Sequence, residues 1–240
     1  VDRRLDNDLI TFSRAQDHSD WELLLVDDGS EDKSLELSYD LARRDERISV
    51  LRQNHQGVAA ARNLTLKHMR GTHVCFIDSD DVVDADHLSR LFSKHDYDMV
   101  VCGYSVDEYD LEGKMTKQTK RLPMPVSIQD IGLDKQELKG LFMDGMIHIN
   151  CNKLLKSKII RENGLYYKCI PVNEDYMFML DYLMCAESFC TIESSTYHWI
   201  RIENQNTGVS SLPDNLLQIY TDAHLLTREF FGEKKMADEI

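Results

Sequence analysis

Short apolar runs alternate with stretches of helical spacing in the first half of the chain. A short apolar run that ends at a turn signal predicts a buried strand. Such runs occur at Trp21–Val26, Ile48–Leu51, Val74–Ile77 and Asp98–Tyr104. Helical spacing occurs at Leu5–Ala15, Lys33–Arg44, Val58–Met69 and Ala85–Lys94. Because strands alternate with helices of roughly 10–15 residues, the pattern predicts an α/β fold with a largely parallel sheet, covered on both faces.

The alternation ends near Tyr104. The polar stretch from Val106 to Leu122 centres on a Leu-Glu-Gly-Lys turn and predicts a hairpin. Beyond it the spacing predicts helices at Ile128–Met143, Ile149–Glu162, Glu174–Ala186 and Leu212–Phe231, and strands at Phe189–Ile192 and Tyr197–Ile202. The chain contains no repeat and no low-complexity linker, so we expect the second half to elaborate the same domain.

The net charge of the chain argues against some classes of function. The 240 residues carry 28 basic and 42 acidic side chains, a net charge of −14. Nucleic-acid binding relies on cationic surface, so we expect no nucleic-acid partner. An excess of carboxylates is better suited to binding a metal ion than to binding a nucleic acid. The six cysteines form no CxxC pair and most lie in apolar runs, which predicts reduced thiols rather than disulfides.

No apolar run approaches about 18 residues and no signal-peptide pattern is present, which predicts a cytoplasmic protein without a membrane span. The basic residues Lys114, Lys117, Lys120 and Arg121 could approach an anionic lipid at the inner face of the membrane. A solvated hairpin is the simpler interpretation of these residues.

Two acidic clusters follow predicted strands. Asp27-Asp28-Gly29-Ser30 follows the first and Asp78-Ser79-Asp80-Asp81 follows the third. The first is also a typical turn sequence, and the second could cap a helix that starts near Asp84. In open α/β sheets, however, ligands bind at the carboxyl ends of the strands. Three neighbouring aspartates repel one another, and Mg²⁺ or Mn²⁺ would relieve that repulsion.

Between the clusters lies the segment Gln53–Asn63, which reads QNHQGVAAARN. Gly57 would allow a tight approach at the start of a helix, and the helix N-terminus favours an anion. Arg62 could reach a phosphate or a carboxylate of the acidic clusters. An Ala-rich packing helix with a surface arginine explains the spacing equally well.

These segments in this order resemble glycosyltransferase family 2, which has the GT-A fold. The resemblance rests on WELLLVDDGS, NHQGVAAARN and CFIDSDD, and it continues through Asn152-Lys153-Leu154-Leu155 and Glu174-Asp175-Tyr176-Met177-Phe178. It ends with Tyr197-His198-Trp199-Ile200-Arg201 and the serines Ser210 and Ser211. It implies a mixed, mainly parallel sheet, with a nucleotide-sugar-binding half at residues 1–104 and an acceptor and catalytic half at residues 105–240.

The chain departs from the family pattern at its start. Family members usually begin with a strand of the type VSIIVPVYN, whereas Val1-Asp2-Arg3-Arg4-Leu5 resembles the segment after that strand. Absence of this central strand would leave two neighbouring strands partly unpaired.

The resemblance also implies roles for individual residues. Asp28 would bind the uracil ring and Asp27 would support the turn. Arg62 would lie near the nucleotide, and Asp80 would contact the ribose or the metal. Asp78 and Asp81 would complete the metal site. His198 could be a late metal ligand, although a packing role is the simpler interpretation.

The implied reaction is an inverting transfer of a sugar from a UDP-sugar to a glycan or lipid-linked acceptor in cell-surface polysaccharide synthesis. Asp175 would be the general base, because a sugar hydroxyl needs a carboxylate to accept its proton. Glu174 is the reserve base, pointing to another side of the helix start. A divalent cation, Mn²⁺ or Mg²⁺, would stabilise the leaving diphosphate.

Two other functions fit parts of the sequence. The DxD spacing at Asp78 also occurs in aspartate phosphotransferases of the haloacid-dehalogenase type. A degenerate, non-catalytic module that binds a nucleotide is the other alternative.

Overall fold

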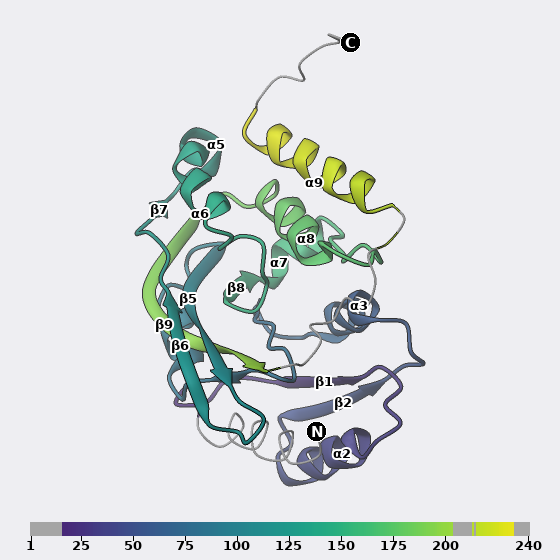
Figure 1. Ribbon diagram of the computed structural model, residues 1–240. Coiled ribbons are helices and arrows are strands. Elements are labelled where there is room, and N and C mark those ends of the chain that lie inside the picture. The colour runs from purple at the N-terminus through teal and green to yellow at the C-terminus, as the bar shows by residue number, and fades with distance from the viewer. Residues whose placement is uncertain (1–15, 204–212, 214, 233–240) are drawn as a thin grey trace.

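The computed structural model describes residues 16–203, 213 and 215–232 (Figure 1). The described strands form a two-stranded sheet, β1-β2, and a seven-stranded sheet with the order β3-β8-β5-β9-β4, in which β6 also pairs with β5 and β7 with β9. The strands are β1 (Leu23–Asp27), β2 (Ile48–Arg52), β3 (His73–Val74), β4 (Val82–Val83), β5 (Met99–Tyr109), β6 (Met115–Arg121), β7 (Ser127–Ile128), β8 (Lys153–Lys156) and β9 (Phe189–Ile202).

Helices cover the sheets. They are α2 (Ser34–Arg44), α3 (Val58–His68), α4 (His87–Phe92), α5 (Ile131–Asp134), α6 (Lys139–Met143), α7 (Ser157–Glu162), α8 (Glu174–Leu183) and α9 (Leu216–Phe230), with a 3₁₀ turn at Lys135–Leu138. The α/β prediction is therefore confirmed, as is the hairpin, which β5 and β6 form. The helix predicted at Leu5–Ala15 lies outside the described residues.

The prediction of a mainly parallel sheet is wrong. Among the described strands, only β1–β2 and β5–β9 pair in parallel, and the other five pairings are antiparallel. The tight β5–β6 turn returns the chain antiparallel to itself, and β8 runs antiparallel between β3 and β5. The sheet is mixed because the elements after Tyr104 do not continue the strand–helix alternation.

Strand β8 corrects a second prediction. The sequence predicts one helix over Ile149–Glu162, but β8 occupies Lys153–Lys156 and only Ser157–Glu162 is helical. Lys153, Leu154 and Leu155 are all buried, so this strand shows no alternation between faces. A short run buried on both faces cannot be told from a buried helix by its period.

The two late strands predicted from the sequence are one strand, β9, which runs the length of β5. The register between them shifts around Gly103. A Cβ atom there would lie 2.3 Å from the carbonyl oxygen of Arg121, so only glycine fits where β5 bends between its neighbours.

The two sheets share no strand pairing among the described residues. Strand β1 pairs only with β2, and β3 ends at Val74 instead of continuing to Ile77.

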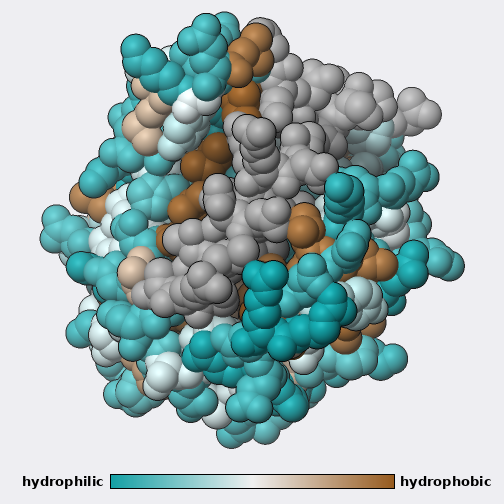
Figure 2. Space-filling model, turned by 90° about the horizontal axis from the view of Figure 1, so that it is seen from below, coloured by the Kyte–Doolittle hydropathy of each residue, from teal (hydrophilic) through white to brown (hydrophobic). Residues whose placement is uncertain are grey.

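The main hydrophobic core lies between the larger sheet and helix α8. Residues Tyr176 to Leu180 are all buried, because the sheet covers one side of α8 and α9 covers another. Figure 1 shows α9 lying beside α8, and the hydroxyl groups of Tyr176 and Thr227 are 2.6 Å apart between them. The face viewed from below is mainly hydrophilic where it is described, in keeping with the high net charge (Figure 2). No helix among the described residues is long and apolar enough to cross a membrane.

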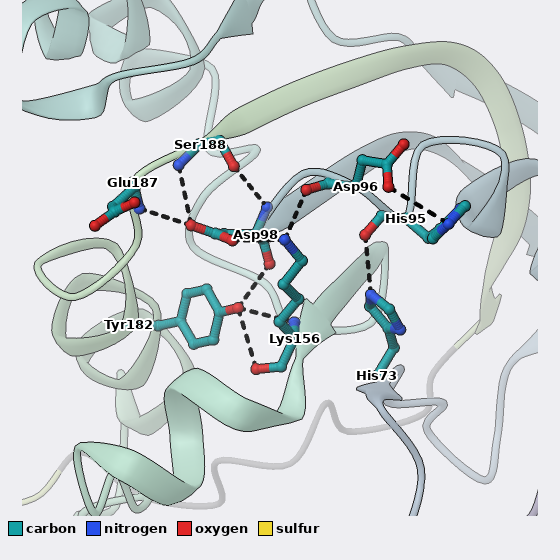
Figure 3. Close-up of polar contacts among 8 residues, drawn as sticks. All are labelled: His73, His95, Asp96, Asp98, Lys156, Tyr182, Glu187 and Ser188. Carbon is teal, nitrogen blue, oxygen red and sulfur yellow. Dashed lines mark hydrogen bonds and ion pairs between the residues drawn. The ribbon is translucent and has the colours of Figure 1, made fainter.

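Asp98 joins the start of β5 to three other segments (Figure 3). Its carboxylate accepts hydrogen bonds from the backbone amides of Glu187 and Ser188, at 2.8 and 3.1 Å, and lies 2.9 Å from Nζ of Lys156. The Tyr182 hydroxyl donates to the Asp98 carbonyl oxygen at 2.6 Å. Burial alone would raise the pKa of Asp98, but Lys156 and the backbone amides hold it below its ordinary value.

We predict that Asp98→Asn lowers the free energy of unfolding by about 2 kcal/mol at pH 7, the typical worth of hydrogen bonds to a charged group. Because the folded-state pKa is lowered, the carboxylate stabilises the fold above its unfolded pKa of about 3.9, and this contribution is lost as the pH falls through the folded value. Urea denaturation should therefore show a difference that shrinks below about pH 4. Asp96→Asn is the control, since its side chain is 92% exposed. Equal effects of the two changes would contradict the prediction.

Candidate functional site

A pocket of about 590 Å³ lies where the two halves of the chain meet. The first half contributes the acidic segment after β3, and the second half contributes the start of α8, the loop before β8 and the end of β9. Its lining residues are Asp78, Asp80, Asp81, Tyr104, Ile149, Asn150, Cys151, Asp175, Tyr197, Trp199, Ile200, Arg201 and Ile202. Two acidic segments almost 100 residues apart in the sequence thus face one cavity.

Arg62 joins these two acidic segments without lining the pocket itself. Its side chain is 11% exposed, and its guanidinium bonds Asp78 at 3.1 Å, Glu174 at 3.1 Å and Asp175 at a shorter distance. Burial alone would lower the pKa of this guanidinium, but the carboxylates of Asp175 and Asp78 raise it above its ordinary value. The expectation that Arg62 could reach the acidic clusters is confirmed, and the arginine is a buried ion-pair centre rather than a surface residue.

Asp175 is the pocket carboxylate with the most unusual environment. It follows Asn173, whose left-handed backbone (φ 63°) turns the chain into α8. Burial raises the pKa of Asp175 to about 7, and the charge of Glu174 adds to this effect while Arg62 opposes it. Both acids bond the same nitrogen of Arg62, so the expectation that Glu174 points to another side of the helix start is wrong. Of the two, only Asp175 lines the pocket.

Asp81 is held in the pocket wall by β9. Its two oxygens accept hydrogen bonds from the Tyr197 hydroxyl and from the backbone amide of Ile200, the latter at 2.9 Å. Burial raises the pKa of Asp81 to about 7; the hydrogen bonds from Tyr197 and Ile200 oppose this effect, and the charges of Asp80 and Asp78 add to it. The alternative that this segment caps a helix is wrong, because α4 begins at His87 and no side chain caps it.

The three aspartates of this segment suit a divalent cation by their chemistry. They share one pocket, and neighbouring carboxylates repel one another unless a positive charge lies between them. Asp80 is exposed, and Asp78 is 41% exposed. Among the described residues, no three carboxylate, histidine or cysteine side chains are already arranged as a metal site.

Asp28 holds the loop that leads into α3. Its carboxylate accepts hydrogen bonds from Gln53 Nε2 at 2.7 Å and from the backbone amides of Gln56 and Gly57, both at 2.8 Å. Burial would raise the pKa of Asp28, but these hydrogen bonds hold it below its ordinary value. Gly57 is required for its positive φ of 90°, and open space around it shows that close approach is not the reason.

Asp27 supports its turn as expected, since its Oδ1 accepts a hydrogen bond from the Ser30 amide at 3.2 Å. His198 has neighbours on both ring nitrogens, Asp107 at 3.0 Å and Asp84 at 3.1 Å. These contacts fix the ring between β4 and β5, which agrees with a packing role. Ser210 and Ser211 lie outside the described residues.

Several pocket residues were not among the site residues predicted from the sequence; Tyr197 and Trp199 could stack on a sugar, but core packing was the simpler interpretation. Tyr197, Trp199 and Arg201 come from the YHWIR segment, and Asn150 lies just before the NKL segment. The Arg201 guanidinium lies over the Trp199 ring, 4.1 Å from its centroid. The sequence motifs identified these segments. The alternation of side chains along β9, which points the Tyr197 hydroxyl toward Asp81, is seen only in the structure.

Comparison with known proteins shows the family of the chain. The model of glycosyl transferase family 2 matches residues 8–164. The chain belongs to this family. It is 30% identical over 195 residues to an uncharacterized glycosyltransferase of Haemophilus influenzae, covering 78% of this chain and 70% of that protein. It is 27% identical over 191 residues to EpsH of Bacillus subtilis, covering 78% of this chain and only 54% of EpsH.

The fold comparison agrees with the family. The crystal structure of S. aureus TarS 1–349 in complex with UDP-GlcNAc superposes with a TM-score of 0.67 at 17% identity, over 93% of this chain and 62% of that one. The family member therefore has the GT-A fold that the resemblance implied. The haloacid-dehalogenase alternative is wrong. The chain spans about half the length of EpsH. These comparisons therefore establish the family and the fold, and the activity of the whole protein is a proposal.

We predict that Arg62→Met lowers the free energy of unfolding by about 3 kcal/mol or more, because it leaves partly buried carboxylates without their counter-charge. Arg70→Met is a matched control: Arg70 also pairs with a glutamate, Glu22, but its side chain is 77% exposed. An exposed pair is worth at most about 1 kcal/mol. Urea denaturation of both variants at pH 7.5 checks the difference, and a small, equal loss would contradict the central role of Arg62.

Proposed function

We propose that this family 2 member transfers a sugar from a UDP-sugar to a glycan or lipid-linked acceptor, with inversion at the anomeric carbon, in cell-surface polysaccharide synthesis. The observation that carries the proposal is the meeting of Asp78, Asp80 and Asp81 with Asp175 in one pocket. A donor diphosphate needs positive charge, and an acceptor hydroxyl needs a base. The UDP-GlcNAc bound by TarS, a structural neighbour, supports a UDP-sugar as donor.

Asp175 is the proposed general base. A carboxyl with a pKa of about 7 is ionised in a large fraction of molecules at neutral pH, yet is basic enough to accept the proton of an attacking hydroxyl. Arg62 holds this carboxylate in place from one side, which leaves its other side for the acceptor. With a single base and no carboxylate serving as nucleophile, the displacement is direct and inverts the anomeric centre.

A divalent cation is the proposed partner of the acidic segment. Asp80 and Asp78 have the most accessible oxygens of the segment, and Asp81 would join them from the pocket wall. When bound, the cation supplies positive charge to the leaving diphosphate. Arg201, at the same pocket, adds a guanidinium that suits a phosphate oxygen.

The remaining assignments stay predictions. We assign Asp27, Asp28, Arg62 and Asp80 to the nucleotide side of the site, with Asp28 and Arg62 acting in part by shaping it. Residues 1–104 form the donor half and residues 105–240 the acceptor half, since the pocket takes its acids from both. A location in the cytoplasm at the inner face of the membrane suits a lipid-linked acceptor.

The first prediction of this proposal concerns the cation. Mn²⁺ should strengthen UDP binding at least about tenfold in calorimetry, because two phosphates and three carboxylates repel one another without it. Asp80→Asn should remove most of this gain and leave the melting temperature unchanged, since its side chain is exposed. Asp96→Asn, also exposed, should retain the gain. Equal UDP affinity with Mn²⁺ and with excess chelator would disprove the cation assignment.

The second prediction concerns the base. Asp175→Asn should lower kcat by about 10²–10⁴-fold and leave UDP binding nearly intact, the usual loss on removing a general base. In the wild type, kcat should rise with pH through about 7, because the carboxylate must be ionised to accept a proton. Glu174→Gln should cost less, because Glu174 bonds Arg62 without lining the pocket.

The measurement is release of UDP from a panel of UDP-sugars with and without acceptor. If Glu174→Gln abolishes turnover and Asp175→Asn does not, Glu174 is the base. If the wild-type chain binds UDP-sugars and releases no UDP with any donor, the chain is a non-catalytic nucleotide-binding module.

A further inference from the structure

Lys153 is a buried cation that the proposed mechanism does not use. It is the first residue of β8, and it is fully buried. Its Nζ donates hydrogen bonds to the carbonyl oxygens of Met146 (2.7 Å) and Ile149, and to Oδ1 of Asn152 at 2.7 Å. An ammonium has three N–H donors, so all three are used. Burial lowers the pKa of Lys153 to about 8. Because this value is still above 7, most Lys153 side chains remain protonated at neutral pH.

These hydrogen bonds shape a stretch of the pocket wall. The acceptors span Met146 to Asn152, and the residues between them that line the pocket are Ile149, Asn150 and Cys151. Asn152 in turn donates to the Cys102 carbonyl oxygen at 2.7 Å, which fastens the same stretch to β5. The hydrogen bonds of Lys153 therefore hold the loop from Met146 to Asn152 in place.

Asn150 is a buried polar residue in this part of the pocket wall. It is 1% exposed, and its Nδ2 donates to the Tyr167 hydroxyl at 3.1 Å. Its Oδ1 has no hydrogen-bond partner among the described residues. A buried amide oxygen without a partner is costly, and a substrate hydroxyl could satisfy it once the wall adjusts to a bound sugar.

The charge of Lys153 also acts on the base. Groups that act electrostatically on Asp175 are the carboxylates of Glu174 and Asp78, which raise its pKa, and the cations of Arg62 and Lys153, which lower it. The Tyr167 hydroxyl is nearby and is held neutral, since burial raises its pKa well above the ordinary value. Lysine is almost never fully buried unless it is paired, and the partners of Lys153 are oxygens of the stretch that forms the pocket wall.

We propose that Lys153 is a positioning residue for sugar transfer, which holds the pocket wall at Ile149–Cys151 in its active shape. This inference rests on the proposed function. It concerns the second half of the pocket, where no role was assigned to the NKL segment beyond its resemblance to the family.

The test compares two lysines of the same strand. Lys156, three residues along β8, also has a hydrogen-bonded ammonium, which bonds the Asp96 carbonyl oxygen and the Asp98 carboxylate away from the pocket (Figure 3). Lys153→Met and Lys156→Met each remove one ammonium from β8. We would measure the melting temperature, kcat, KM for donor and acceptor, and the pH profile of kcat from pH 5.5 to 9 for both. Lys153→Gln serves as a second variant that keeps amide donors but has no charge.

We expect both Met variants to melt at lower temperature. Only Lys153→Met should lower kcat/KM by about tenfold or more, because small displacements of a pocket wall are costly to the rate. Its acidic limb should move to higher pH, because a charge that lowers the pKa of Asp175 is gone. Lys153→Gln should recover part of kcat/KM through its hydrogen bonds and keep the shifted pH profile.

Other results would overturn the inference. If Lys153→Met has the kinetics and pH profile of Lys156→Met, Lys153 is structural only. If neither Lys153 variant folds while Lys156→Met does, Lys153 belongs to the stability of the fold, and the inference is also wrong. If the wild type turns over no UDP-sugar, the proposed function fails before Lys153 is tested, so the two failures are distinct.

Discussion

The ion pairs of Arg62 are the interaction on which the candidate site depends. One guanidinium neutralises carboxylates from the segment after β3 and from the start of α8, which are 16 and 113 positions away in the sequence. Without it, Asp78, Glu174 and Asp175 would face one another across a partly buried space as like charges. Removing one member of such a buried cluster costs far more than the cluster adds to stability, because the remaining charges lose their partner. The arginine therefore fixes where the two acidic segments meet.

Local signals in the sequence predicted the parts of the site but not its assembly. The runs ending in DDGS and DSDD and the start of α8 were found because each is a contiguous pattern with a turn or a helix start. The bonds of Arg62 to Glu174 and Asp175 and the hydrogen bond from Tyr197 to Asp81 join residues more than 100 positions apart, and no periodicity reports such contacts. The sheet shows the same limit, since β8 is buried on both faces and reads as a helix. Its antiparallel direction depends on the fold around it.

Asp81 and Asp175 show how two environments separate the roles of similar groups. Burial raises the pKa of both to about 7. Asp81, however, receives hydrogen bonds from a tyrosine and a backbone amide, which are neutral donors fixed in β9. Asp175, in the first turn of α8, is contacted by a cation, the guanidinium of Arg62. The first arrangement holds a carboxylate still beside two other acids, as a cation site requires. The second keeps a carboxylate partly ionised beside open space, as a base requires.

The position of Arg62 in turn depends on how α3 begins. Asp28 bonds the two backbone amides that precede the helix, and Gly57 supplies the positive φ through which the chain turns into it. Arg62 follows Gly57 by five residues, a little more than one helical turn. A shift of one residue at this start would rotate the guanidinium by about 100° around the helix axis and away from Asp175. The conformation of the loop between β2 and α3 therefore decides whether Arg62 reaches Asp175, so Asp28 acts on the proposed base through this loop without touching it.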